Sequence, residues 1–215
     1  TVGIYIGIAY CPTKCTYCSF PSYLKEGKHL ERFDEYFNSL IHEIREVGKL
    51  VKKLNLGVNT IYIGGGTPSI LTKEEMDKML ETIAKNYDID KLKEFTYELG
   101  RIDTIDEEKL EVLKKWKVDR ISINPQTFNE KTSILVNRYY SKERFDEIFQ
   151  KAKEMGLTDT KYYVDDGYTG TNFNRPGFQQ LIDDIEIGLV SAVMVKDLSR
   201  LGRDYVSVGN YTDSY

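Results

Sequence analysis

The chain has 215 residues, of which 40% are hydrophobic, so it can build one sizeable domain, or one domain and part of another. Its formal net charge of −4 excludes a basic nucleic-acid-binding surface spread over the whole chain. No apolar run is long enough to cross a membrane and no secretory signal is visible, so the sequence predicts a cytoplasmic protein with no membrane partner.

Strand and helix signals alternate over the first 160 residues. Runs of β-branched and apolar residues indicate buried strands, and apolar residues repeated at helical spacing indicate the helices between them. Two of the helices begin with a Thr followed three residues later by a Glu, the spacing of a capping box. The predicted strands are Val2–Ala9, Thr60–Ile63, Glu94–Leu99 and Arg120–Asn124, and the predicted helices are Leu30–Leu54, Thr72–Asn86 (Thr72 with Glu75), Thr104–Trp116 (Thr104 with Glu107) and Phe145–Met155.

Repeated strand–helix units predict an α/β fold with a parallel sheet, either open or closed into a barrel. In such folds, functional residues gather where the strands end. Four strands are followed or ended by candidates of this kind: a cysteine loop, the run Gly64–Pro68, Glu98 and Gln126. Their shared position predicts one site at the carboxyl edge of the sheet.

All three cysteines lie in one short segment, Cys11-Pro-Thr-Lys-Cys15-Thr-Tyr-Cys18. Thiolates at this C-x3-C-x2-C spacing can ligate three corners of a cubane iron–sulfur cluster and leave the fourth iron open. An odd number of cysteines does not suit a disulfide framework. A zinc site or three unrelated thiols is the alternative, although the only histidines, His29 and His42, are not spaced to complete a zinc site.

The other residues at this edge suit a small polar ligand. An open iron can chelate the amine and carboxylate of an amino acid, as radical enzymes hold S-adenosylmethionine. Gly64–Pro68 lets the backbone approach such a ligand, or forms only a tight turn between strand and helix. Glu98 can accept hydrogen bonds from a ribose or an amine, or is a satisfied carboxylate at a strand end. Tyr17 stacks on adenine, shields the cluster or packs within its loop.

The sequence around these residues resembles the radical S-adenosylmethionine superfamily. The resemblance lies in Tyr5–Phe20, IYIGGGTPSIL, EFTYELGR and DRISINPQTFNEKT, and residues 1–160 are similar to oxygen-independent coproporphyrinogen III oxidases. It implies a partial (β/α)6 barrel, a 4Fe–4S cluster and S-adenosylmethionine, which is cleaved reductively to a 5′-deoxyadenosyl radical. The implied reaction is oxidative decarboxylation of porphyrinogen propionates in haem biosynthesis, with a porphyrinogen-like substrate and an electron-donor protein as partners. Related haem-handling proteins that are not oxidases are the alternative.

Position by position, the resemblance assigns roles at the sheet edge. Cys11, Cys15 and Cys18 match the cluster ligands. Gln126 and Arg138 match residues that contact the cofactor in the family. The alternatives are that Gln126 is an ordinary loop amide and that Arg138 is a solvated charge on a helix. The family usually has Pro-Phe before the first cysteine, whereas this chain has Ala9-Tyr10, and losing the proline loosens the entry to the loop. The expected cofactor-binding residues are Tyr5, Tyr17, Gly65, Gly66, Thr67, Glu98, Gln126 and Arg138.

Residues 161–215 resemble a different family, the catalytic domain of serine recombinases. The motifs are DDGYTGTNFNRPG and VKDLSRLGRD, and the join at residue 160 has no linker. Arg175, Arg200 and Arg203 match arginines that surround a scissile phosphate, a role that suits guanidinium groups; the plainer interpretation is surface arginines. The chain is therefore predicted to be a fusion of two interrupted proteins. Disruption by a mobile element, a sequence-assembly error and deliberate design are all consistent with this arrangement.

The recombinase-like tail is not expected to act on DNA. The family's nucleophilic serine belongs to an earlier segment that the tail lacks, so no covalent phosphoserine intermediate can form. The tail holds five Lys or Arg against eight Asp or Glu, which does not favour binding to phosphates. Its β-α-β order, Tyr162–Asp165, Pro176–Ile187 and Ser191–Lys196, predicts that it docks as the fifth and sixth strands of the barrel.

Overall fold

The computed structural model describes residues 1–157, residue 163 and residues 174–187. The chain divides into two compact units, Thr1–Asp159 and Thr160–Tyr215. The predicted tail strands over 162–165 and 191–196 lie outside the described residues, apart from Tyr163, so their docking stays a prediction.

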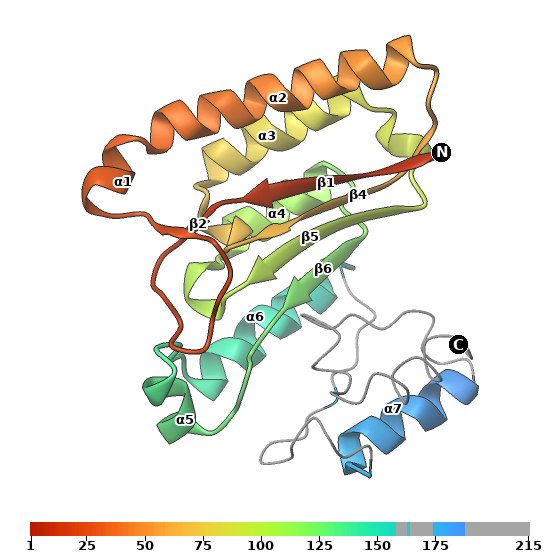
Figure 1. Cartoon of the computed structure of the whole chain (residues 1–215). Coiled ribbons are helices and arrows are strands. Elements are labelled where there is room, and N and C mark those ends of the chain that lie inside the picture. Colours follow the sequence, from red (N-terminus) through yellow and green to blue (C-terminus); the bar gives the residue numbers. More distant parts are fainter. Residues whose placement is uncertain (158–162, 164–173, 188–215) are drawn as a thin grey trace. The chain divides into compact units, whose positions relative to one another are not determined.

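The first unit is built on a four-stranded parallel sheet with strand order β1-β4-β5-β6 (Figure 1). Because all four strands run the same way, they end at one edge, called the C-terminal edge below. The predicted α/β fold with a parallel sheet is thereby confirmed. The strands are β1 (Val2–Ile8), β4 (Val58–Gly65), β5 (Glu94–Gly100) and β6 (Arg120–Ile123), and a separate parallel pair is formed by β2 (Tyr10–Cys11) and β3 (Tyr23–Leu24).

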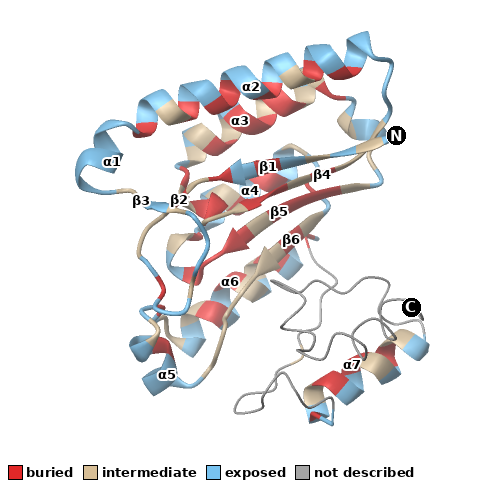
Figure 2. Cartoon of the chain, viewed as in Figure 1, coloured by how far each residue is buried: buried red, intermediate tan, exposed pale blue. Residues whose placement is uncertain are grey.

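Helices cover one face of this sheet, and their buried sides meet it (Figure 2). The core is formed where alternate strand residues, such as Ile63 and Tyr97, pack against helix residues such as Met79 and Phe145. The helices are α1 (Gly27–Glu31), α2 (Phe33–Lys53), α3 (Lys73–Asn86), α4 (Glu107–Lys115), α5 (Glu130–Leu135) and α6 (Lys142–Glu154), with 3-10 turns η1 (Pro68–Ile70), η2 (Ile89–Lys91) and η3 (Ile102–Thr104), and the second unit contains α7 (Pro176–Glu186).

The first strand is buried on one side only, which differs from the fully buried strand that its composition predicts. Ile6 and Ile8 face the helices and are buried, whereas Tyr5 and Gly7 are exposed on the other face. Strand residues alternate between the two faces of a sheet, so the open face displays a row of residues from each strand. This open face of the sheet presents tyrosines, glycines and Glu98.

The helix ends confirm one predicted cap and correct another. Thr72 and Glu75 form the predicted capping box of α3, with the Thr72 hydroxyl accepting from the Glu75 amide at 3.2 Å. The predicted cap at Thr104 is wrong, because Thr104 ends η3 and the Asp106 carboxylate accepts from the Lys109 amide at 2.9 Å. The predicted helix over 30–54 is two helices that meet at Arg32.

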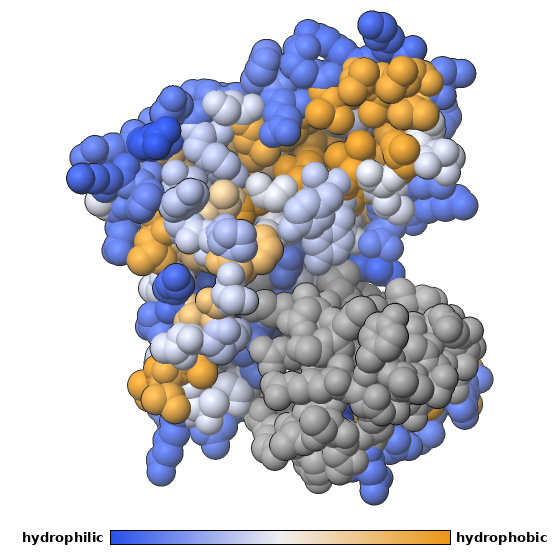
Figure 3. Space-filling view, in the orientation of Figure 1, coloured by the Kyte–Doolittle hydropathy of each residue, from blue (hydrophilic) through white to orange (hydrophobic). Residues whose placement is uncertain are grey.

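Figure 3 shows apolar side chains at the surface in several places, among them over the end of α2 and over α5. The exposed residues there are Leu50 and Leu54 on the first element and Ile134 and Leu135 on the second. Among the described helices, none has the length and apolar composition of a membrane span.

Candidate functional site

The cysteine loop, residues 11–18, begins at the C-terminal edge, separated by two residues from the end of β1 at Ile8. All three thiols are free; Cys15 is buried, while Cys11 and Cys18 are half-buried. The Cys18 amide donates to the Cys15 carbonyl at 3.1 Å, which makes the end of the loop a tight turn. The loop therefore presents its three sulfur atoms from a short and compact piece of backbone.

A distant segment of the chain fixes the position of this loop. The Thr16 amide donates to the Val136 carbonyl at 3.3 Å, and the Asn137 side chain donates to the Lys14 carbonyl at 3.1 Å. The Thr13 hydroxyl donates to the Asn137 carbonyl at 3.4 Å. These bonds join the loop to the connection between α5 and α6, so the fold and not the loop alone determines where the cysteines lie.

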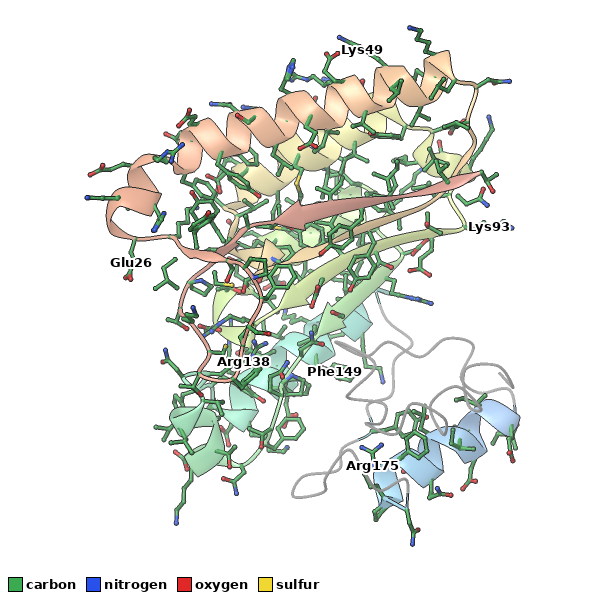
Figure 4. All side chains as sticks on the ribbon, in the orientation of Figure 1. Glu26, Lys49, Lys93, Arg138, Phe149 and Arg175 are labelled. Atoms are coloured by element: carbon green, nitrogen blue, oxygen red, sulfur yellow. The ribbon has the colours of Figure 1, made fainter. Side chains whose placement is uncertain are left out.

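Arg138, labelled in Figure 4, comes from the same connection. Its guanidinium donates to the Cys15 sulfur at 3.9 Å, to the Asn124 carbonyl at 3.0 Å and to the Gly100 carbonyl. The side chain is only 7% exposed. The interpretation of Arg138 as a solvated helix charge is therefore wrong, since it lies outside any helix and is buried against a thiol.

Arg101 is a site residue that the sequence analysis missed. It follows β5, is 4% exposed, and donates to the Thr13 hydroxyl at 2.8 Å and to the Cys15 sulfur at 3.7 Å. Asp103 accepts two further bonds from the same guanidinium, at 2.9 and 2.7 Å. Burial lowers the pKa of Arg101, but Asp103 and the nearby Cys15 and Cys11 outweigh burial and raise it overall. The one available signal was its position directly after a strand at the C-terminal edge.

The glycine turn, Gly64–Pro68, ends β4 beside the cysteine loop. A side chain on Gly65 would lie 2.6 Å from the Ile8 carbonyl oxygen, and one on Gly66 would lie 2.6 Å from the Tyr10 carbonyl oxygen and 3.0 Å from the Cys11 sulfur. The Gly66 amide donates to Ile8 at 2.7 Å. These glycines therefore allow the turn to approach the chain's own backbone at the start of the cysteine loop.

Thr67 connects the glycine turn directly to a cysteine. Its hydroxyl donates to the Cys11 sulfur at 3.4 Å, and its amide donates to the Tyr10 carbonyl at 2.9 Å. The amides of Gly66 and Thr67 are used within the chain, and the Thr67 and Pro68 carbonyls accept from the Ile70 and Leu71 amides at 2.9 and 3.3 Å. Among the carbonyls of the turn, those of the glycines are therefore the candidates to accept from a ligand's amine.

Glu98 lies on the open face of the sheet with two tyrosines. Tyr5 and Tyr62 are paired in neighbouring strands, and their rings stack with centroids 5.9 Å apart. Burial first, and then the charge of Glu98, raise the pKa of both phenols, and Glu98 also accepts a hydrogen bond from Tyr62. Asn124 donates to Glu98 at 3.4 Å. This pair of rings beside a carboxylate gives the face both a flat apolar surface and a hydrogen-bond acceptor.

Tyr17 and Gln126 lie in loops at the same edge. Tyr17 is in the cysteine loop and is 37% exposed. Gln126 follows β6 and has a φ of 67°, a left-handed conformation that is uncommon for residues other than glycine. Such backbone strain is frequent at ligand-binding positions.

The donor set around the cysteines fits thiolate ligands. Cys15 receives hydrogen bonds from two guanidinium groups and Cys11 from one hydroxyl, so polar donors already surround the sulfurs that a cluster would use. Among the described residues, no three His, Cys, Asp or Glu side chains are grouped to hold a metal ion.

Arg175, one of the three recombinase-like arginines, lies at the start of α7 in the second unit. It is 8% exposed, and its guanidinium lies 4.9 Å from the centre of the Phe178 ring. It is therefore not the surface arginine of the plainer interpretation. Arg200 and Arg203 lie outside the described residues.

The model of the radical SAM superfamily matches residues 5–185 of this chain. The chain belongs to this superfamily. Membership implies a 4Fe–4S cluster and S-adenosylmethionine as cofactors, as the cysteine spacing predicts. The match continues past the predicted junction at residue 160, and none of the similar proteins described below supports the predicted recombinase segment.

Proteins of haem metabolism are among the similar sequences. The oxygen-independent coproporphyrinogen-III oxidase-like protein HemZ of Bacillus subtilis is 37% identical over 199 residues, which are 92% of this chain and 39% of the relative. The heme chaperone HemW of Lactococcus lactis is 35% identical over 155 residues, 71% of this chain and 38% of the relative. This chain thus spans about two fifths of the length of these relatives.

A solved structure has the same fold. Coproporphyrinogen III oxidase (HemN) from Escherichia coli superposes with a TM-score of 0.64, covering 85% of this chain and 41% of that chain at 23% identity. The similarity confirms a radical SAM-type arrangement of strands and helices in this chain.

Proposed function

We propose that Cys11, Cys15 and Cys18 bind the 4Fe–4S cluster and leave one iron open for S-adenosylmethionine. The hydrogen bonds to the cysteine sulfurs support this most directly. Two buried guanidinium groups donate to Cys15, and the Thr67 hydroxyl donates to Cys11. When bound, the cluster supplies the electron that cleaves S-adenosylmethionine to the 5′-deoxyadenosyl radical.

The remaining predicted residues would hold S-adenosylmethionine at the C-terminal edge. In this proposal the glycine turn accepts hydrogen bonds from the methionyl amine through its carbonyls, and Glu98 accepts them from the ribose. Tyr17 covers the cluster or adenine from the exposed side of the cysteine loop. The residues assigned to the cofactor are Tyr5, Tyr17, Gly65, Gly66, Thr67, Glu98, Gln126 and Arg138.

The reaction we propose is the oxidative decarboxylation of a porphyrinogen-like substrate. Relatives named as coproporphyrinogen oxidases or oxidase-like proteins support this substrate class. The stacked Tyr5 and Tyr62 rings offer a flat apolar surface on the open face of the sheet, which suits a macrocycle. An electron-donor protein would reduce the cluster before each cleavage.

The test is anaerobic reconstitution with iron and sulfide, followed by dithionite and S-adenosylmethionine. We expect 5′-deoxyadenosine to form, and we expect Cys15→Ala to abolish both the cluster spectrum and the product. Ser19→Ala, which changes an exposed residue next to Cys18, is the matched control and should behave as the original chain. A reconstituted cluster that yields no 5′-deoxyadenosine would contradict the enzymatic proposal.

A non-catalytic haem-binding protein is the second candidate, because the heme chaperone HemW shares 35% identity over 155 residues. This alternative predicts a Soret band on titration with haem and no 5′-deoxyadenosine. The enzymatic proposal predicts the opposite pair of results, so the two assays together distinguish the candidates.

For residues 161–215, the recombinase motifs remain the only support for a DNA-related origin. We propose that this segment is vestigial, since it is acidic and lacks the nucleophile of the family. A gel-shift assay with recombination-site DNA at fixed salt should show no specific complex, and a specific shift would contradict this.

A further inference from the structure

Arg101 contacts a proposed cluster ligand but is not among the residues proposed to bind S-adenosylmethionine. It donates to the Cys15 sulfur at 3.7 Å and to Thr13 in the same loop at 2.8 Å. Both Arg101 and Cys15 are at least nine-tenths buried, so water screens their interaction little. Unlike Arg138, Arg101 also pairs with a carboxylate, that of Asp103.

We propose that Arg101 and Asp103 form a charge pair that tunes the reduction potential of the cluster through Cys15. Arg101 is thus a positioning residue, which acts on a ligand of the cluster and not on S-adenosylmethionine. This inference rests on the proposed assignment of Cys15 as a cluster ligand.

The geometry determines the sign of each effect. The positive guanidinium lies next to the sulfur, and Asp103 binds its far side through Nε and Nη2, with the two Asp103 oxygens at 2.9 and 2.7 Å. One-electron reduction adds a negative charge beside Cys15, so Arg101 favours the reduced form and Asp103 opposes it. Removing Arg101 should lower the reduction potential, and removing the charge of Asp103 should raise it.

The partial cancellation of the two charges limits the size of these shifts. For Arg101→Gln we expect the equilibrium constant for one-electron reduction of the cluster to fall about tenfold, which corresponds to a reduction potential lower by about 59 mV. Asp103 is more distant from the sulfur and its side chain is 37% exposed, so solvent screens it more. For Asp103→Asn we expect the same equilibrium constant to rise about threefold, which corresponds to a reduction potential higher by about 28 mV.

The experiment is a potentiometric titration of the reconstituted full chain, followed by the electron paramagnetic resonance signal of the reduced cluster. Iron content is measured on the same samples. The matched controls are Arg120→Gln and Glu94→Gln, which break a different arginine–carboxylate pair, between the first residues of β6 and β5, with a bond of 2.9 Å. Both controls should leave the potential unchanged.

Shifts of opposite sign in the two Arg101–Asp103 variants support the proposal, because a merely structural role would not produce them. Unchanged potentials with full iron content would overturn it. Should Arg101→Gln bind no cluster, the Asp103→Asn variant decides alone: a rise supports the proposal and no rise overturns it. Absence of a cluster in the original chain would instead refute the assignment of the cysteines.

Discussion

Replacing Gly66 by Ala is the substitution that most directly connects the fold to the cysteine site. The new Cβ would lie 2.6 Å from the Tyr10 carbonyl oxygen and 3.0 Å from the Cys11 sulfur. The first distance is to backbone, which cannot rotate away. Overpacking of this kind costs about 1–3 kcal/mol, and weakening the 2.7 Å bond from the Gly66 amide to Ile8 adds about 1 kcal/mol.

We therefore expect Gly66→Ala to lose about 3 kcal/mol of unfolding free energy, a large share of the roughly 5–15 kcal/mol of a typical domain. With an m-value of about 2 kcal/mol/M, the urea midpoint falls by about 1.5 M. Because Cys11 is the neighbour, reconstituted iron content should fall as well.

The control is Gly156→Ala, at a φ of 70° with nothing within 4 Å of the added carbon. This variant carries only the cost of a left-handed backbone, about 1 kcal/mol, and should keep its iron. If Gly66→Ala unfolded at the same urea concentration as the original chain and bound as much iron, the packing argument for the glycine turn would be refuted.

Three smaller predictions concern the scaffold. Asp106→Ala should lose about 1 kcal/mol in urea unfolding, because it removes the cap of α4; an unchanged midpoint would show that another residue caps this helix. The pKa of Asp77 lies below its ordinary 3.8 because of hydrogen bonds, first from Lys115 and then from a neighbouring indole, so its stabilisation is present above that pH and disappears as the pH falls through the lower folded value. The melting temperature of Asp77→Asn should thus be lower than that of the original chain at neutral pH, and the two melting temperatures should converge in acid. A difference in melting temperature that stays the same at every pH would contradict this. Tyr97→Phe leaves the Pro68 carbonyl without its 2.9 Å donor inside the core, and should cost about 1–2 kcal/mol by the same urea assay.

Periodic features of the fold could be predicted from the sequence, and features that depend on tertiary contacts could not. The strands after the first and the capping box of α3 follow from local patterns of apolar and capping residues. Helix α5 was missed because Ile134 and Leu135 are exposed, so its six residues show no buried stripe. Thr104 has the spacing of a cap, but it ends a 3-10 turn, and the helix begins only at Glu107, after its cap Asp106.

In the candidate site, too, the features set by local spacing could be predicted and those set by tertiary contacts could not. The cysteine spacing predicted the cluster, since local spacing is what a cluster requires of its ligands, and the superfamily followed from this segment together with the three other motifs. The role of the glycines was less predictable, because the groups beside them, the Ile8 and Tyr10 carbonyls, come from two other strands, β1 and β2. Arg101 could not be found from spacing, as its contact with Cys15 joins residues 86 positions apart.

The central claim is that the three cysteines bind one cubane cluster with an open iron. Iron and sulfide analysis of anaerobically reconstituted protein tests it most directly, with metal content measured in parallel for Cys15→Ala. We expect about four iron and four sulfide ions per chain and a loss of both in the variant. One tightly bound zinc per chain, with no iron retained, would contradict the claim.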